Sequence, residues 1–368
     1  MTRIKLKNTP KQVELIKAMA DKDSTKAMQA REAFAEFVGP VIQQVLNLSA
    51  LSPLMYTDWP YSGDNAPEIE LDQFYLAPVG SVTVWQQSQA GGLGSSLVTG
   101  LQTLRLQTYE LDSAVSLLKR NVERGVLPYV SNALNRMSQE LLRFQEYNAF
   151  YIALRALGEA STDGNKHVIA ATTANRLQLD DFNRLLTRSK RLNVAFNGGT
   201  PDQMYSRGAN NAILSPEMME EIRSLAYEPV NTTAVPNTDE STAIPASEAI
   251  RNEVWRNSGV PSFFGITLHE ALEFGISKTY NDIFAAVASG INGPGGAAFA
   301  SATDELVLLW DSSREVILRP VDTDQEGRSV RVEVDDQWSK RSGKIGWFTK
   351  LNEGRAVLDA RAIFGIAI

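Results

Sequence analysis

Apolar residues repeat every seventh position between Tyr129 and Leu157, and this pattern constrains the fold more than any other feature of the chain. Two leucines extend the same face, which comprises Val130, Leu134, Met137, Leu141, Phe144 and Tyr151. The period predicts a single helix over 129–157, far longer than the mean of about 11–12 residues in globular proteins. A helical bundle would need a second helix of comparable length, and the sequence predicts none. We therefore expect one long helix that lies along a β-sheet.

The C-terminal part of the chain is rich in strand patterns. Apolar runs occur at 306–310 and 316–318, and valines alternate with charged residues over 330–334. A turn at Asn352–Gly354 predicts a hairpin between 346–348 and 356–358, and the closing residues AIFGIAI predict a buried last strand. Helices and strands in separate blocks are typical of the α+β class.

Shorter helices are predicted elsewhere. A capping pattern begins one at Thr9, and another follows Asp23 until Gly39–Pro40 should interrupt it. Other helices are expected at 111–125, 180–191 and 247–257, with a further helix start at Thr267–Glu270. Between Asn210 and Leu225 the sequence predicts a strand, an N-cap at Ser215, and a short amphipathic helix.

Residues 72–110 predict a long two-stranded ribbon with a glycine-rich tip. An isolated ribbon is marginally stable in water, so we expect this one to lie on a partner. The candidate contact residues are Trp85, Gly91, Gly92, Gly94 and Arg105, together with Pro294 and Phe299 from the glycine-rich run 289–302.

The composition excludes several kinds of site. The chain has no cysteine, which excludes disulfides, thiol catalysis and thiolate metal sites. Its two histidines, His167 and His269, leave little material for a histidine-rich centre. The formal net charge of -7 argues against a surface built throughout for nucleic-acid phosphates, but it allows a local basic patch. No apolar run reaches the roughly 18 residues of a membrane helix.

None of the catalytic sequence motifs considered is complete in this chain. His269–Glu273 begins like HExxH, but Glu273 stands where the second histidine is needed. Gly92–Leu97 lacks the last glycine of GxGxxG. The acidic pairs Asp180–Asp181 and Asp335–Asp336 are typical of helix starts and turns. We expect no catalytic residue, no cofactor and no metal, and therefore no enzyme activity.

The first residues form a basic arm in an acidic chain. Its cations are Arg3, Lys5, Lys7, Lys11, Lys17, Lys22 and Lys26. Such a run is most often a solvated helix face. The functional alternative is an arm that faces a polyanion or an acidic neighbour inside an assembly, with Lys5, Lys7, Lys11 and Lys17 as the candidates.

Taken in order, these elements resemble the major capsid proteins of tailed bacteriophages, which have the Hong Kong 97-like fold. The resemblance rests on NNAILSPEMMEEI from Asn210, SGVPSFFGI from Ser258 and GWFTKLNEGRAVLDARAIFGIAI from Gly346. It implies an N-terminal arm (1–71), an extended β-hairpin loop (72–110), a peripheral domain (111–209) with a spine helix (129–157), an axial domain (210–322), and closing strands (323–368) that return to the peripheral domain.

The resemblance also implies a function. Copies would form the hexamers and pentamers of an icosahedral shell around double-stranded DNA, assembled in the host cytoplasm and kept as the capsid of the virion. Partners would be further copies, the packaged DNA, and portal, scaffolding and decoration proteins, with no membrane. The alternative is an encapsulin-like nanocompartment shell that packages cargo enzymes. A stand-alone α+β enzyme is a third option.

One departure from the family is visible in the sequence. Some members join subunits by an isopeptide bond from a lysine in the extended loop. Between Leu71 and Leu111 this chain has no lysine, and its Arg105 stays protonated and is a poor nucleophile. We therefore expect a shell without covalent cross-links.

Overall fold

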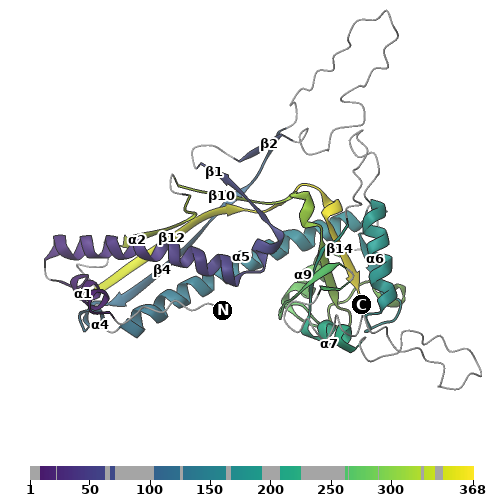
Figure 1. Ribbon diagram of the computed structural model, residues 1–368, viewed down its shortest axis with the longest axis horizontal. Helices are drawn as coiled ribbons and strands as arrows, with labels where there is room; N and C mark the ends of the chain where they lie inside the picture. The colour runs from purple at the N-terminus through teal and green to yellow at the C-terminus, as the bar shows by residue number, and fades with distance from the viewer. Residues whose placement is uncertain are drawn as a thin grey trace, which may run out of the picture. The chain divides into compact units, whose positions relative to one another are not determined.

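The structure is a computed structural model of the chain (Figure 1). It describes residues 9–21, 23–62, 67–70, 103–124, 127–162, 167–192, 208–224, 262–263, 265–288, 290–324, 327–335 and 343–368. Both helices and sheets occur in these residues, so the predicted α+β class is confirmed.

Two compact units divide the chain, and each combines segments that are distant in sequence. Unit 1 comprises Met1–Ile69, Leu104–Ala149 and Leu318–Ala356. Unit 2 comprises Glu70–Thr103, Phe150–Ile317 and Val357–Ile368. The predicted domain boundaries remain predictions.

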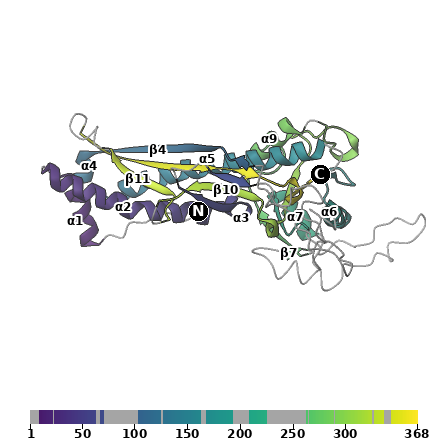
Figure 2. The ribbon, with the colours of Figure 1, turned by 90° about the horizontal axis from the view of Figure 1, so that it is seen from above.

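Unit 1 contains a mixed sheet, in which β1 pairs in parallel with β10 and the long strands β4 and β12 pair antiparallel. In the described residues its sheet has the order β1-β10-β12-β11, and β4 and β13 pair with β12 and β10 respectively. These strands are β1 (Thr57–Tyr61), β4 (Thr108–Leu118), β10 (Ile317–Asp322), β11 (Val330–Asp335), β12 (Lys344–Gly354) and β13 (Ala356–Val357). Short strands β2 (Glu68–Glu70) and β3 (Thr103–Arg105) pair separately. The β12–β4 ladder covers the full length of both strands, so it is the main strand pairing of this unit (Figure 2).

Helices cover one face of this sheet. They are α1 (Pro10–Ala18), α2 (Ser24–Ser49), α3 (Ser52–Met55), α4 (Lys119–Glu123) and the part of α5 (Leu127–Thr162) that ends at Ala149. Phe34 of α2 packs on Trp347 of β12, with ring centroids 5.3 Å apart, and Leu134 of α5 joins the same core. On β4, Leu117 is buried, whereas Asp112 and Ser116 are exposed on the opposite face. The core therefore lies on one side of the sheet, and the other side is open.

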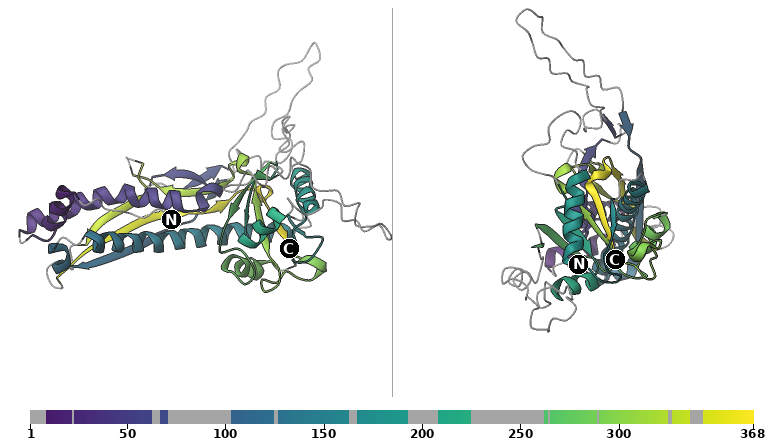
Figure 3. Two further views of the ribbon diagram at one scale, coloured as in Figure 1. Left: turned by 60° about the horizontal axis from the view of Figure 1, so that its bottom comes forward. Right: turned by 90° about the vertical axis from the view of Figure 1, so that its right-hand side faces the viewer.

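Unit 2 contains a mixed sheet with the order β5-β14-β9-β6-β8-β7 in the described residues. Its strands are β5 (Val168–Ala170), β6 (Asn211–Leu214), β7 (Ser262–Phe263), β8 (Ile266–Glu270), β9 (Leu306–Trp310) and β14 (Ile363–Ala367). Its helices are α6 (Leu179–Leu192), α7 (Pro216–Ser224), α9 (Thr279–Val287) and the end of α5, with 3-10 turns η4 (Pro294–Gly296), η5 (Ser312–Arg314) and η6 (Ala360–Ala362). The last strand, β14, is fully buried as predicted and lies beside α6 (Figure 3).

The predicted long helix is confirmed as the 36-residue α5, but the expectation of no second long helix is wrong. α2 has 26 residues and continues through Pro40. The predicted interruption at Gly39–Pro40 fails because residues on both sides of it, such as Val38 and Ile42, enter one core. Packing of a continuous apolar face outweighs the hydrogen bond that proline removes.

The segment predicted as a helix over 111–125 is mostly strand. β4 runs to Leu118, and only Lys119–Glu123 is helical. Val115 and Leu117 face the core while Ala114 and Ser116 are exposed, which is the period of a strand. The segment forms a strand and not a helix because it pairs with the whole of β12. This pairing gives hydrogen-bond partners to the backbone groups along the full segment.

Two turn predictions are also wrong. Thr267–Glu270 does not start a helix but lies in β8, which pairs in parallel with β6 from Asn211 onward. Asn352–Gly354 does not form a turn, because β12 continues through it and pairs with Tyr109 and Thr108 of β4. In both places, strand pairing with distant residues overrides the local signal.

The module at 210–225 is confirmed where it is described. β6 ends at Leu214, and α7 begins at Pro216. The Ser215 hydroxyl accepts a 3.1 Å hydrogen bond from the Met218 amide, as an N-cap should. The helix predicted at 180–191 is confirmed as α6. At Thr9 the predicted capping pattern starts α1, but no side-chain cap forms. The helix predicted at 247–257 lies outside the described residues.

Candidate functional site

The structure describes only some of the predicted contact residues. Arg105 is exposed on β3. Pro294 opens η4, and Phe299 is buried edge-on against Phe284, with ring centroids 5.0 Å apart. The tip residues Trp85, Gly91, Gly92 and Gly94 lie outside the described residues. A contact role for any of these residues stays a prediction.

The basic arm is described in part. Lys11 and Lys17 are both exposed on α1. Lys5 and Lys7 lie outside the described residues. On α1 the buried side chain is Ile16, so the helix turns its apolar face inward and its lysines outward.

The histidine motif has no catalytic geometry. HExxH needs a helix to bring its side chains to one face, but His269 lies on the strand β8. Its ring stacks on Trp310 at 5.9 Å, and its Nε2 lies 3.4 Å from Asn211 Oδ1. Within the described ranges, no group of His, Cys, Asp and Glu has the arrangement of a metal site. Among the helices described, none has the length and apolar character that a bilayer span requires.

The acidic pair at the start of α6 has a structural role. Asp181 is buried and accepts hydrogen bonds from the Thr172 amide at 3.0 Å and hydroxyl at 2.9 Å. It also accepts one from the Gln178 amide at 3.2 Å. Its carboxylate therefore ties the loop before α6 to the first turn of the helix. Asp335 lies in β11, and Asp336 is outside the described residues.

The most connected buried polar group in the described chain is Glu353 of β12, whose side chain is 0% exposed. Arg319 of β10 donates from Nε to its Oε2 at 2.8 Å, and Gln145 of α5 donates to the same oxygen at 2.9 Å. Arg355 reaches Oε1 at 3.2 Å, as does the Tyr109 hydroxyl of β4. One carboxylate thus joins two strands and a helix to β12.

The surroundings of Glu353 shift several pKa values. Burial, together with the nearby Glu353 carboxylate, raises the pKa of Tyr109 to about 12, although the Arg355 charge opposes this shift. Burial also raises the pKa of Tyr56, whose ring lies 4.9 Å from the Arg355 guanidinium. Both phenols therefore stay neutral at physiological pH. The cluster contains a single fixed carboxylate between two guanidinium groups and no proton donor or acceptor suited to catalysis near neutral pH.

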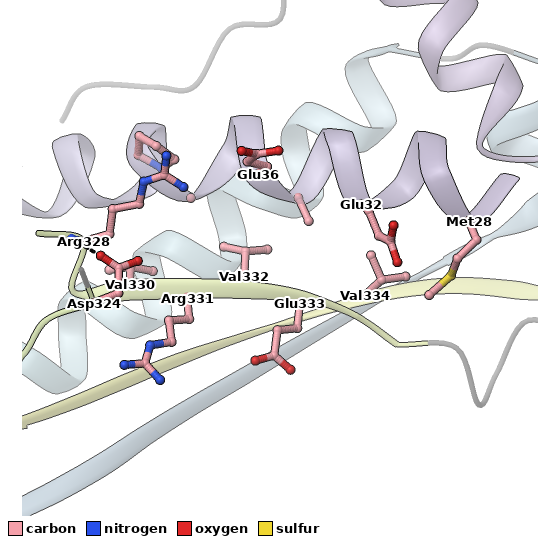
Figure 4. Close-up of a pocket in the computed structure, with 13 residues that line it drawn as sticks. Met28, Glu32, Glu36, Asp324, Arg328, Val330, Arg331, Val332, Glu333 and Val334 are labelled. Atoms are coloured by element: carbon pink, nitrogen blue, oxygen red, sulfur yellow. Dashed lines mark hydrogen bonds between the residues drawn. The ribbon is translucent and has the colours of Figure 1, made fainter. Parts of the chain in front are cut away.

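A groove of about 420 Å³ lies between α2 and β11 (Figure 4). Figure 4 shows Val332 and Val334 of β11 directed toward α2, whereas Arg331 and Glu333 point away from it. Glu32 and Glu36 stand one turn apart on the α2 side. Like charges at this spacing weakly destabilise a helix. The groove is lined by valines of β11 and by charged residues of both signs, namely Glu32, Glu36, Asp324, Glu333, Arg328 and Arg331.

A buried pair links the α7 cap to β9. Glu305 is 5% exposed, and its Oε2 accepts a 2.7 Å hydrogen bond from the Ser215 hydroxyl. Burial raises the pKa of Glu305, the Ser215 hydrogen bond opposes this, and the charge of Glu217 adds to it. Ionised Glu305 is therefore disfavoured in the fold.

This pair predicts a pH effect on stability. The unfolded chain ionises Glu305 near its ordinary value of 4.5, whereas the folded chain does so at a higher pH. The penalty is thus absent below pH 4.5, grows as pH rises from 4.5 to the folded pKa, and is constant above the folded pKa. We expect the melting temperature of Glu305→Gln, relative to the unsubstituted chain, to rise between pH 4.5 and 7. Thermal unfolding followed by circular dichroism checks this. Glu220→Gln, at an exposed position on α7, should show no such trend, and a flat difference for Glu305→Gln would contradict the assignment.

Comparison with known proteins gives matches only at the level of three-dimensional structure. No family model matches the sequence, and no curated protein matches it. The structure of Microbacterium phage Oxtober96 is 14% identical, with a TM-score of 0.48 over 87% of this chain and 90% of that one. The Cyanophage Pam1 capsid asymmetric unit is 12% identical, with a TM-score of 0.43 over 84% and 87%. The holo-SrpI encapsulin complex of Synechococcus elongatus is 13% identical, with a TM-score of 0.42 over 72% and 74%.

All three of these TM-scores lie below 0.5, and the resemblance to Hong Kong 97-like shell proteins stays an expectation from the sequence. The resembling structures include phage capsids and an encapsulin, so the likeness itself does not distinguish a virus shell from a compartment shell. At these identities and TM-scores, the structural likeness also assigns no binding partner to this chain and no functional role to any of its residues.

The sequence patterns did not reveal several large apolar side chains that are exposed in the structure. Phe144 is 51% exposed and Tyr147 is 43% exposed, one turn apart on α5. Phe37 on α2 and Leu272 after β8 are exposed by 52% and 73%. Phe144 was assigned to the buried face by its seven-residue spacing. Its exposure places large apolar groups on separate surfaces, where a neighbouring chain could cover them.

Proposed function

We propose that this chain is the structural subunit of an icosahedral shell, in which copies form hexamers and pentamers around double-stranded DNA. Assembly in a host cytoplasm, portal, scaffolding and decoration partners, and the absence of covalent cross-links belong to the same proposal. No enzymatic role is part of it. The alternative is a compartment shell that packages cargo enzymes.

The observation that carries the proposal is helix α5. Its first part supplies Leu134 and Leu141 to the core of unit 1, and its last part supplies Phe150 and Leu154 to the buried interior of unit 2. Between them the helix exposes Phe144 and Tyr147. A helix that contributes side chains to both cores and carries exposed aromatic groups suits a subunit that contacts several copies of itself. Weak contacts repeated around many neighbours then add up by multivalency.

The test of assembly uses the purified full chain in light scattering and electron microscopy. We expect closed shells. The double substitution Phe144→Glu and Tyr147→Glu should raise the assembly threshold concentration by at least about 30-fold, because hot-spot aromatic contacts contribute about 2 kcal/mol or more. Gln44→Glu, at an exposed position on α2, is the matched control and should assemble normally. A chain that stays monomeric at all concentrations would contradict the proposal.

The contents and the gel pattern of the particles decide between the finer alternatives. Particles purified with long double-stranded DNA support the capsid, and a co-purifying cargo enzyme supports the compartment. Single bands of intact subunits on denaturing gels support a non-covalent shell, and ladders contradict it. The missing lysine between Leu71 and Leu111 is the reason to expect single bands.

A further inference from the structure

A row of arginines lines a hollow along one face of α6. Arg184, Arg188 and Arg191 follow at i, i+4 and i+7, which places them on one side of the helix. Asn183 and Thr187 line the same hollow, whose volume is about 790 Å³. Asp180 is the only acid among its lining residues, and Ile169 of β5 is the only large apolar one. The wall is therefore cationic in a chain whose formal net charge is -7.

The first arginine of the row is held in place. Arg184 Nη1 donates to the Thr172 hydroxyl at 2.9 Å and lies 3.4 Å from Asp181 Oδ1. Asp181 is itself fixed by the Thr172 amide. The Arg184 side chain is still 45% exposed, so it retains donors for a ligand. A guanidinium positioned in this way loses little conformational freedom on binding.

A second hollow continues the first one across the edge of the sheet. It has a volume of about 320 Å³ and shares Ile169 and Arg184 with the first hollow. Its other walls are Ser161 of α5 and the glycine-rich turn 290–296. Among the described residues that line it, none is acidic. The two hollows adjoin at Ile169 and Arg184 beside β5, the edge strand of the unit 2 sheet in the described residues, and we call them together the groove.

The charged and titratable groups beside the groove do not cancel the positive charge of its arginines. His167, next to β5, is buried, and its Nδ1 lies 3.0 Å from the Ile363 carbonyl oxygen. Burial lowers the pKa of His167 most, and the charge of Arg188 lowers it further. Buried Asp181 offsets part of the charge of Arg184. Counting Asp180 and Asp181 against the three arginines leaves a net charge of 3 − 2 = +1 for this part of α6 and its start.

We propose that this groove, through Arg184, Arg188 and Arg191, binds the phosphodiester backbone of the enclosed nucleic acid. The inference rests on the proposed shell function and names the surface that meets the DNA. Guanidinium groups bind phosphate in bidentate geometry, and the Asn183 amide and Thr187 hydroxyl add neutral donors of the kind that proteins use on DNA backbones.

The spacing of the row supports a linear polyanion. Seven helical residues rise about 10.5 Å, a length over which one strand of B-DNA carries about three phosphates. A peptide partner is less suited, because no aromatic side chain is among the lining residues described, whose larger apolar members are Val168, Ile169 and Ile291. The binding is expected to be independent of base sequence, since the proposed contacts go to the phosphodiester backbone, which carries no direct sequence information.

The test measures the salt dependence of DNA binding by the full chain. Fluorescence anisotropy of a labelled duplex of ~20 base pairs, between 50 and 200 mM salt, gives the slope of log affinity against log salt. In the double substitution Arg188→Gln and Arg191→Gln, the slope should fall by about 1.8, because each lost phosphate contact accounts for about 0.9. The affinity at the lowest salt concentration should fall by at least about tenfold.

Matched variants make the result decisive. Arg120→Gln with Arg124→Gln removes the same charge from two exposed positions on α4 and at its end, and should leave the slope unchanged. Arg188→Lys with Arg191→Lys should keep the slope but weaken the affinity, since lysine lacks the bidentate fork. Melting curves show that each variant is folded. The proposal is overturned if the Arg188 and Arg191 variant keeps the original slope, if the Arg120 and Arg124 variant loses slope instead, or if polyglutamate competes as well as DNA at equal charge.

The outcomes separate this inference from the proposed function. Shells that form normally but lose DNA binding in the glutamine variant support both proposals. Shells whose DNA binding is unaffected overturn only the groove. A chain that binds DNA through these arginines but forms no particles overturns the shell and keeps the groove.

Discussion

Replacing Glu353 by alanine should lower the free energy of unfolding of the chain by about 3–5 kcal/mol. The reason is the pair of guanidinium groups that this carboxylate holds. Arg319 is 7% exposed and Arg355 is 1% exposed at the side chain, so neither can turn to water without opening the sheet. Removing the carboxylate takes the buried counter-charge from both cations and leaves Arg319 with the more exposed Asp58, which costs far more than the loss of a surface pair.

Chemical denaturation followed by circular dichroism measures this loss. Asp58→Asn is the matched control, because Asp58 lies 3.3 Å from the same Arg319 but is 57% exposed. Solvent screening limits its expected cost to less than about 1 kcal/mol. Equal losses of unfolding free energy for Glu353→Ala and Asp58→Asn would show that burial of the Glu353 cluster does not determine how much the cluster stabilises the fold.

The Glu353 cluster also illustrates what the sequence does not reveal. Its members come from β4, α5, β10 and β12 and are separated by up to 244 residues. No local pattern marks any one of them, since a glutamate in Asn352–Gly354 looks like part of a turn. Only the pairing of β12 along the whole of β4 brings them together. Long-range strand pairing is the feature that local propensity describes least.

The long helix shows both the strength and the limit of periodicity. The apolar run predicted α5 correctly, yet Phe144 was assigned to its buried face and is exposed. An ideal α-helix drifts by roughly 20° per heptad, so a strict repeat of seven leaves the core after two or three repeats. The buried positions instead shift through Leu141, Gln145 and Ala149. The seven-residue spacing therefore identified the helix but misplaced its outer aromatic groups.

The module at 210–225 and helix α6 were predictable because their signals are local. Ser215 and Pro216 define a helix start whatever the surroundings, and α7 begins there. Helix α9 was missed, although Tyr280, Ile283 and Phe284 are buried with helical spacing. The arginine row on α6 is also visible in the sequence, but only the adjoining strand β5 and the glycine-rich turn show that it lines a groove.

Replacing Gly354 by alanine should destabilise the chain by about 3 kcal/mol, at the upper end of the usual cost of overpacking. Gly354 is the last residue of β12, opposite Thr108 of β4. A Cβ atom there would clash with the Gln107 carbonyl oxygen and would lie 2.9 Å from Pro320 Cγ. A backbone carbonyl and a proline ring cannot rotate away, so the ends of two ladders would have to separate.

The matched control for this prediction is Gly39→Ala in the same unit. Gly39 lies inside α2, and a Cβ there would be 3.6 Å from the Val330 carbonyl oxygen, an ordinary van der Waals contact. Alanine should therefore stabilise the helix, by up to about 1 kcal/mol, because glycine loses more backbone entropy on folding. Denaturant melts of the two variants should move in opposite directions from the unsubstituted chain. A stabilised Gly354→Ala would mean that β10 and β4 approach β12 less closely at this point than the structure shows, and that the β12 end is free to adjust.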